Sequence, residues 1–202
     1  MTGRLYLISS LRDDLVDFLE AAVRGGVDVV QIREKGAADG TLLRGLEEAR
    51  AVTRSLAVPL VVNDRPDLAV LCEADYVHVG QDDLPVRAAR RFGVQVGLST
   101  HTPLEIAAAD ADYIGVGPVF STPTKPGRPA VGLDLVRSAA ARARVPWFAI
   151  GGIDTSNAAD VVAAGASRLA VVRAIGDAPD PEHAARQLCR ILAGARAPVG
   201  SG

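Results

Sequence analysis

Short runs of apolar, mostly β-branched residues alternate along the chain with longer segments in which apolar residues recur every three or four positions. The first pattern indicates buried strands, and the second indicates amphipathic helices. Eight such pairs follow one another, with strands expected at 5–9, 29–33, 60–63, 76–79, 95–99, 113–116, 148–150 and 168–172. The clearest helices are expected at 14–24, 41–56, 158–164 and 181–192, with residues 154–157 supplying side chains that cap the third of them.

Eight nearly uninterrupted apolar strands, each followed by a helix, favour an α/β fold in which a parallel sheet closes as a single (β/α)8 TIM barrel. The alternative is an open, doubly wound sheet. No GxGxxG motif opens the first helix, however, and polar residues follow many strands rather than one switch point. The length of 202 residues predicts one domain over residues 1–202, with 196–202 as a flexible tail.

Composition and charge narrow the classes of partner. The net charge is -2, and no run of lysine and arginine is interleaved with aromatic residues, so no nucleic-acid partner is expected. No apolar run reaches the roughly 18 residues of a membrane span, and no secretory leader is evident, which predicts a cytoplasmic protein without a membrane partner. Cys72 and Cys189 lie far apart without a CxxC pattern and are expected to be reduced, structural thiols.

Polar residues fall where the expected strands end, and the carboxyl ends of barrel strands form the working face of such a fold. The second strand runs into QIREK, in which the two-residue period places Gln31, Arg33 and Lys35 on one side and Ile32 on the other. Two cations and an amide on one side indicate a diphosphate or another acidic substrate.

Carboxylates follow the next two strands. Asn63 and Asp64 lie in NDRPD, and Asp83 lies in HVGQDD. Two carboxylates near two cations predict Mg²⁺ shared with phosphate oxygens, although aspartates at such loops also cap helices. His78 lies within a strand and is expected to be a packed histidine rather than a ligand or a base.

The stretch 113–132 joins an apolar strand to a loop typical of phosphate binding. Gly115 and Gly117 allow close approach of the backbone to a ligand. Hydroxyl groups and one positive charge are offered by Ser121, Thr122, Thr124 and Lys125. A flexible surface loop is the alternative interpretation.

Three further strand ends complete the expected rim. Ser99 and His101 follow the fifth strand, and the sequence leaves open whether His101 is a base or a hydrogen-bond donor to the loop. Gly151 and Gly152 follow the seventh strand ahead of a helix and fit a phosphomonoester, and the loop 172–174 closes the same pocket.

Taken together, the motifs resemble those of the thiamine phosphate synthase family over essentially the whole chain. They occur in the order QIREK, NDRPD, HVGQDD, GLSTH, STPTK, AIGGI and VVRAI. The resemblance implies a transferase of thiamine biosynthesis with Mg²⁺ as cofactor and two small-molecule substrates, hydroxymethylpyrimidine diphosphate and a thiazole phosphate or its carboxylated form. It implies a dissociative reaction that yields thiamine phosphate and diphosphate, and a homodimer is left open.

The resemblance also implies roles for individual residues. The pyrimidine diphosphate is assigned to Gln31, Arg33, Lys35, Asn63, Ser99 and Lys125, of which Arg33, Lys35, Ser99 and Lys125 are catalytic. Mg²⁺ is assigned to Asp64 and Asp83. The thiazole phosphate is assigned to Thr122, Thr124, Gly152, Val172 and Arg173. The substrate-binding set is completed by Ile32, Glu34 and Pro123.

Three residues depart from the family pattern, and three other functions compete with the transferase. Arg173 stands where many relatives have serine, and Ser167 and Arg168 replace a pair that is more usually acidic or small with glycine. A thiazole tautomerase of the same fold does not need the diphosphate site, and a catalytically idle barrel does not need intact aspartates. A phosphosugar isomerase or epimerase fails to explain QIREK together with the two aspartates.

Overall fold

The computed structural model describes residues 1–122 and 130–194 and has eight parallel strands that close into a barrel in chain order. Closure is made by β1 and β8, in which Leu5 lies opposite Leu169. The strands are β1 Leu5–Ser9, β2 Val29–Ile32, β3 Leu60–Asn63, β4 Tyr76–Val79, β5 Gln95–Thr100, β6 Tyr113–Val116, β7 Trp147–Ile150 and β8 Leu169–Val171. The predicted (β/α)8 barrel is therefore confirmed, and the open sheet is wrong.

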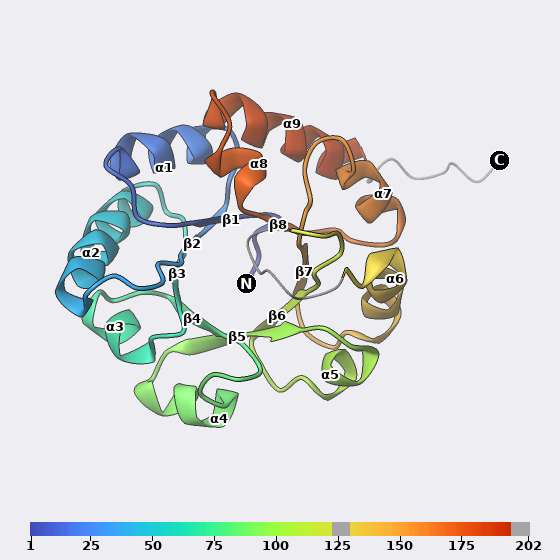
Figure 1. The fold of residues 1–202 in the computed structure, drawn as a ribbon, viewed down its shortest axis with the longest axis horizontal. Helices are drawn as coiled ribbons and strands as arrows, with labels where there is room; N and C mark the ends of the chain where they lie inside the picture. Colours follow the sequence, from blue (N-terminus) through green and yellow to red (C-terminus); the bar gives the residue numbers. More distant parts are fainter. Residues whose placement is uncertain (123–129, 195–202) are drawn as a thin grey trace.

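The helices other than α8 form a ring around the strands when the barrel is viewed along its axis, and α8 lies inside that ring (Figure 1). They are α1 Leu15–Arg24, α2 Asp39–Ser55, α3 Pro66–Leu71, α4 Val86–Ala89, α5 Pro103–Ala108, α6 Gly132–Arg142, α7 Ala158–Ala163, α8 Arg173–Gly176 and α9 Pro181–Gly194, with a 3₁₀ turn at Arg90–Phe92. No helix among residues 1–122 and 130–194 is long and apolar enough to cross a bilayer.

The expected boundaries either coincide with the observed ones or differ from them by one or two residues. Strand β2 ends at Ile32 rather than at Arg33, although the Arg33 amide still donates to Ser9 O at 2.7 Å. The expected capping of α7 is wrong in detail. Asn157 makes no side-chain cap bond, and its carboxamide instead accepts from the Asp154 amide and donates to Gly152 O.

Side chains alternate between two apolar layers, as the two-residue period of a strand requires. Outward-facing residues such as Val30 and Ile32 pack beneath the helices, and inward-facing residues such as Tyr6, Tyr113 and Phe148 fill the barrel. The Tyr113 ring centroid lies 6.0 Å from that of Tyr6 and 5.9 Å from that of Phe148, in edge-to-face contacts.

A glycine makes room for the central ring. A Cβ atom at Gly97 would lie 2.1 Å from Cζ of Tyr113, so no side chain fits at that position while the ring keeps its place. The glycine on β5 therefore allows a tyrosine on the neighbouring strand β6 to occupy the barrel axis.

Three aspartates each precede an even-numbered strand and accept from an amide at or next to the first residue of the strand before it. We call Asp28, Asp75 and Asp112 the strand-start aspartates. Asp28 accepts from the Arg4 and Leu5 amides, Asp75 from the Leu60 amide at 2.8 Å, and Asp112 from the Val96 amide at 2.7 Å. Because they lie at the amino ends of the strands, they are remote from the carboxyl face.

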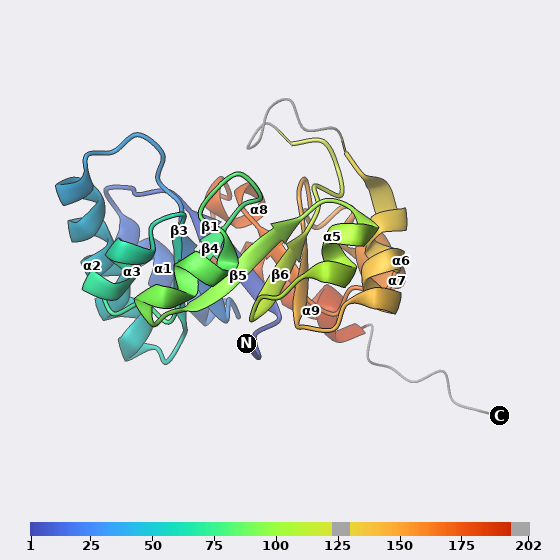
Figure 2. The same cartoon turned by 90° about the horizontal axis from the view of Figure 1, so that it is seen from below.

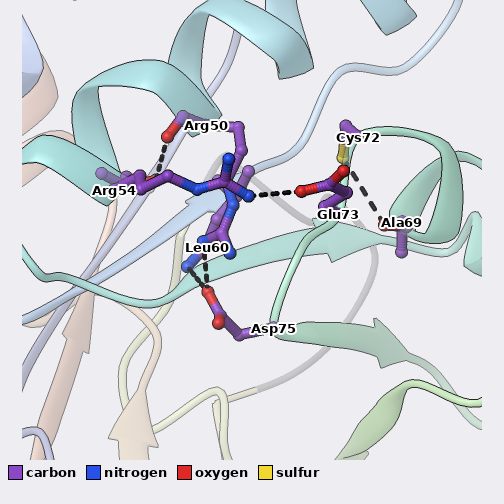
Figure 3. A network of polar contacts seen from close by, with 8 residues as sticks. Arg50, Arg54, Leu60, Ala69, Cys72, Glu73 and Asp75 are labelled. Atoms are coloured by element: carbon purple, nitrogen blue, oxygen red, sulfur yellow. Dashed lines mark hydrogen bonds and ion pairs between the residues drawn. The ribbon is translucent and has the colours of Figure 1, made fainter.

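The strand-start aspartate of β4 also binds helix α2. Arg50 Nη1 lies 2.7 Å from Asp75 Oδ2, and Arg54 pairs with Glu73 beside it (Figure 3). Figure 2 shows the barrel from the side, with the N-terminus at one end and α8 at the other. The two ends thus separate an ion-paired amino face from the carboxyl face that holds the pocket.

Candidate active site

A pocket of about 510 Å³ opens among the carboxyl ends of the strands, and its lining includes residues from all eight strands or from the loops that follow them. Most residues expected to form the site line this pocket. They are Gln31, Arg33, Lys35, Asn63, Asp64, Asp83, Ser99, His101, Ser121, Thr122, Gly152, Val172 and Arg173. Residues that lie up to 142 positions apart, such as Gln31 and Arg173, are brought together because the strands run parallel and close into a ring.

Two carboxyl groups and a lysine meet on one side of the pocket. The Asp83 carboxyl group lies beside that of Asp64, and Lys35 Nζ lies 3.7 Å from Asp64 Oδ2. Burial raises the pKa of Asp64, and the Asp83 carboxyl raises it further, whereas Lys35 and Asn63 lower it. Burial and the second carboxyl group thus outweigh the effect of Lys35 on the pKa of Asp64.

Backbone contacts hold both carboxyl groups in place. Asp64 has φ +61°, and its amide donates to His78 O at 2.8 Å. Asp83 Oδ2 accepts from the Gly80 amide at 2.7 Å. The loops after β3 and β4 thus hold Asp64 and Asp83 beside each other.

The oxygen donors of this pair suit a hard cation such as Mg²⁺. Within residues 1–122 and 130–194, no group of three or more His, Cys, Asp or Glu side chains is arranged to hold a metal ion. Mg²⁺ commonly binds one or two carboxylates together with waters and substrate phosphates. A site with two carboxylates fits this type of coordination better than coordination by protein ligands alone.

A chain of polar side chains runs through the barrel interior beneath the pocket. Ser99 Oγ lies 2.9 Å from His78 Nε2, His78 Nδ1 lies 2.9 Å from the Tyr113 hydroxyl, and the Tyr113 hydroxyl lies 2.9 Å from that of Tyr6. Gln31 Nε2 donates to the Tyr6 hydroxyl and completes the set. We call these five residues the interior chain.

Sequence reasoning missed most of the interior chain. His78 is packed, as expected, but it also lines the pocket and is hydrogen-bonded through both ring nitrogens. The available signal was parity. Tyr6, Gln31, His78, Ser99 and Tyr113 all occupy inward positions of their strands, and each of the five carries a polar group there.

Glycines form the opposite side of the pocket, where β7 faces β3 across the ring (Figure 1). Gly151 and Gly152 have φ +105° and +63°, and a Cβ atom at Gly152 would lie 2.8 Å from Phe120 Cβ. This close packing and the left-handed backbone both require glycine. His101 Nδ1 bonds to Gly117 O, so this histidine is tied to the loop after β6.

Arg173 adds a positive charge to this glycine side. It lines the pocket at the start of α8. The pKa of Asp154 is lowered mainly by hydrogen bonds from Ser156, and the Arg173 guanidinium lowers it further. The arginine charge is therefore close enough to act on an anion in this part of the pocket.

Some expected site residues are not among those lining the pocket. The Ile32 side chain packs in the layer beneath the helices, and the Glu34 carboxylate accepts from the Leu11 amide at 3.1 Å. Pro123, Thr124 and Lys125 lie outside the described residues. Roles for these five residues stay predictions.

Comparison with known proteins decides the family. A family model described as thiamine monophosphate synthase matches residues 5–175. The chain belongs to this family. A thiamine-phosphate synthase of Thermus thermophilus is 52% identical over 205 residues, covering 96% of this chain and 99% of the relative, and one of Acidothermus cellulolyticus is 50% identical with 96% of each covered. The resemblance of the motifs is thus confirmed, as is the prediction of a transferase.

Solved structures agree with this membership of the thiamine monophosphate synthase family. A thiamine phosphate pyrophosphorylase from Pyrococcus furiosus superposes with a TM-score of 0.86 at 30% identity, with 96% of each chain covered. A 3-hexulose-6-phosphate synthase superposes with a TM-score of 0.68 at 20% identity, which shows a shared barrel fold alone.

Proposed function

We propose that the protein joins hydroxymethylpyrimidine diphosphate to a thiazole phosphate, plain or carboxylated, and forms thiamine phosphate and diphosphate with Mg²⁺. One observation carries this proposal beyond family membership. Lys35 meets the Asp64–Asp83 pair on one side of a pocket whose other side is formed by Gly151 and Gly152. A pocket with two separate anion-binding sides suits two phosphorylated substrates.

The cationic side suits the diphosphate. Arg33 and Lys35 line the pocket on the loop after β2, and their charges balance a diphosphate that departs with its negative charge. Gln31 and Asn63 lie next to them with amide groups that pair with ring nitrogens and amino groups. We assign Lys125 to the same substrate through the family resemblance.

The glycine side suits the thiazole phosphate. Gly151 and Gly152 leave backbone space for a phosphate, and Thr122 and Arg173 add a hydroxyl donor and a charge. Thr124 and the backbone at Val172 belong to this assignment by family resemblance. The arginine supplements amides in this assignment and does not replace them.

Asp64 and Asp83 are the residues that would hold Mg²⁺, because they are neighbouring carboxyl groups whose mutual repulsion a cation would relieve. When bound, the ion would neutralise part of the diphosphate charge. A homodimer and a cytoplasmic location stay predictions.

The chemistry asks for little proton transfer. The bond between the pyrimidine methylene carbon and the diphosphate oxygen breaks, and its electron pair leaves with the diphosphate. The thiazole nitrogen then donates its lone pair to the methylene carbon and forms the new bond. Arg33 and Lys35 stabilise the leaving group, while the enclosing pocket orients the two substrates and limits the access of water to the cation.

The direct test mixes the protein with both substrates and Mg²⁺ and measures thiamine phosphate and diphosphate in the same sample, with and without EDTA. Equal amounts of both products, lost with EDTA and restored by added Mg²⁺, are expected. Folded protein that yields neither product would overturn the proposal, and products that persist unchanged in EDTA would overturn the role of the metal.

A further inference from the structure

The interior chain contains a fixed direction of hydrogen bonding. A hydroxyl group has one proton to donate, and a neutral imidazole donates from one nitrogen and accepts at the other. The amide nitrogen of Gln31 can only donate. Because Gln31 Nε2 donates to the Tyr6 hydroxyl, the donors and acceptors of the remaining bonds follow one after another.

Tyr6 accepts from Gln31 and therefore donates to the Tyr113 hydroxyl, 2.9 Å away. Tyr113 accepts from Tyr6 and donates to His78 Nδ1. His78 then has an unprotonated Nδ1 and a proton on Nε2, which it donates to Ser99 Oγ. The Ser99 hydroxyl proton is consequently left to point elsewhere, and Ser99 lines the pocket.

We propose that Gln31, through Tyr6 and Tyr113, fixes the Nε2–H tautomer of His78 and thereby makes the Ser99 hydroxyl a donor into the pocket. Tyr6, Tyr113 and His78 are in this sense positioning residues. Ser99 is the group that touches the substrate, and the inference about substrate rests on the proposed function.

Burial gives this direction its energetic weight. The exposed fractions are 1% for Gln31, 2% for Tyr6 and 0% for Tyr113. In such surroundings, a hydroxyl proton without an acceptor costs more than the net value of an ordinary hydrogen bond. Among the described residues, the buried side-chain atoms that lack a partner are Arg50 Nε and Ser138 Oγ, and neither belongs to the interior chain.

The chemical class of the bound atom follows. A donor at Ser99 requires an acceptor on the substrate, which is either an unprotonated ring nitrogen or a phosphate oxygen. An acceptor at Ser99 would instead favour an amino group. At the carboxyl end of β5, the pocket thus selects a substrate atom that has a lone pair to accept the Ser99 proton.

The first test is spectroscopic and does not depend on turnover. The chain has three histidines, so ¹⁵N–¹H correlation of the imidazole rings gives a small spectrum, assigned with His101→Gln and His183→Gln variants. The spectra are recorded at about pH 8.5, roughly two units above the pKa of an unperturbed histidine. A protonated Nε2 and a bare Nδ1 at His78 are expected, and the opposite tautomer would overturn the proposal.

A reversal experiment tests the cause. In Gln31→Glu the carboxylate only accepts, so Tyr6 would donate to it and every later bond would turn around. His78 is then expected to carry its proton on Nδ1. Retention of the Nε2–H tautomer in folded Gln31→Glu would show that residue 31 does not set the direction, and that result would overturn the proposal.

A matched pair of tyrosine variants links direction to catalysis. Tyr113→Phe keeps the packed ring but removes the donor to His78, so mixed tautomers and a roughly tenfold lower kcat are expected. Tyr76→Phe is the control, because Tyr76 packs on the same ring without belonging to the interior chain. Equal tautomer spectra and equal kcat in the two variants would overturn the proposal.

The bound acceptor is identified with two probes. Inorganic diphosphate with Mg²⁺ and hydroxymethylpyrimidine without its diphosphate are titrated into the unmodified protein and into Ser99→Ala. One probe is expected to bind about five- to tenfold more weakly to Ser99→Ala, and that probe has the acceptor. Unchanged binding of both would overturn the role of Ser99. An Nε2–H signal at His78 in a protein without turnover would support the proposed direction of the hydrogen bonds in the interior chain. It would overturn only the proposed function.

Discussion

Asp64 is held in a left-handed backbone conformation, with φ +61°, that residues other than glycine, asparagine and aspartate rarely adopt. A residue in such a conformation is maintained by its surroundings, here by the bond from its amide to His78 O. The carboxyl group that results is half-buried and paired with Asp83. A half-buried carboxyl group beside a second one is typical of a group that binds a ligand rather than of one that caps a helix.

We therefore expect Asp64→Asn to fold normally and to lower turnover about 100-fold or more, because asparagine tolerates the backbone conformation but lacks the charge. Activity is measured over a range of Mg²⁺ concentrations. The control is Asp67→Asn, since Asp67 pairs with Arg65 and is not among the residues lining the pocket. Equal activity in the two variants would overturn the proposed role of Asp64 in holding Mg²⁺.

Gly97 is the second residue with a sharp expectation. A methyl group there would displace the Tyr113 ring, so Gly97→Ala should lower the free energy of unfolding by about 1–3 kcal/mol. Urea denaturation measures this change. Gly40→Ala is the matched control, because the added methyl group would meet only Arg44 at 3.8 Å, and a change within about 0.5 kcal/mol is expected.

At the scale of elements, the strand-start aspartates fix the register between neighbouring strands. Each aspartate accepts from an amide near the start of a strand. Such an amide lies at the end of the sheet ladder, where no further strand residue can accept from it. Arg168 occupies the corresponding position before β8, and its Nε donates to Gly3 O instead. The unusual Arg168 of the sequence is therefore an alternative tie between β8 and the start of the chain.

Asp75→Ala should destabilise the fold without loss of catalysis. It leaves the Leu60 amide and the Arg50 guanidinium without their acceptor, and Arg50 is only 18% exposed, so a loss of about 1–3 kcal/mol is expected. Thermal and urea unfolding measure the loss, and kcat is compared at a temperature where both proteins are folded. Asp110→Ala is the control. The Asp110 side chain, which pairs with Arg90, is 90% exposed, and such ion pairs contribute little to stability.

The elements themselves were largely predictable. The apolar runs identified all eight strands, because parallel strands covered on both faces need apolar residues at nearly every position. Their ends were less certain by a residue or two, as at Arg33, where a ladder bond continues past the last strand residue. Loop motifs likewise identified Asp64 and Asp83 as residues of the pocket, because polar side chains at the end of a strand interrupt the apolar pattern.

The interior chain was harder to predict. Tyr6 and Tyr113 are 107 residues apart, and each alone is an ordinary strand residue. Only closure of the barrel brings the two hydroxyl groups within hydrogen-bonding distance. The sequence shows which face a residue lies on, but it does not show which inward residues share one height in the barrel.

For the whole molecule, the buried phenol groups predict that the stability of the fold decreases at alkaline pH. Burial raises the pKa of both Tyr6 and Tyr113 above the usual value near 10. The folded protein thus keeps these phenols neutral while the unfolded chain ionises them. Their contribution to stability is complete below about pH 10 and is lost as the pH rises toward the folded-state pKa values.

The free energy of unfolding is accordingly expected to fall steeply above about pH 10, by up to about 1.4 kcal/mol per pH unit for each phenol. Urea titrations between about pH 8 and pH 11 measure the slope. In Tyr6→Phe the slope should decrease, because one phenol no longer ionises on unfolding. An unchanged slope would mean that other groups cause the alkaline loss.

The strand-start aspartates also divide the barrel into pairs of strands, and this division has a consequence for split proteins. A break near Gly93, ahead of β5, leaves each aspartate in the same fragment as the amide that it binds. A break near Asp110, ahead of β6, separates Val96 from Asp112. Fragments cut at the first point should therefore reassemble into an active barrel more readily than fragments cut at the second.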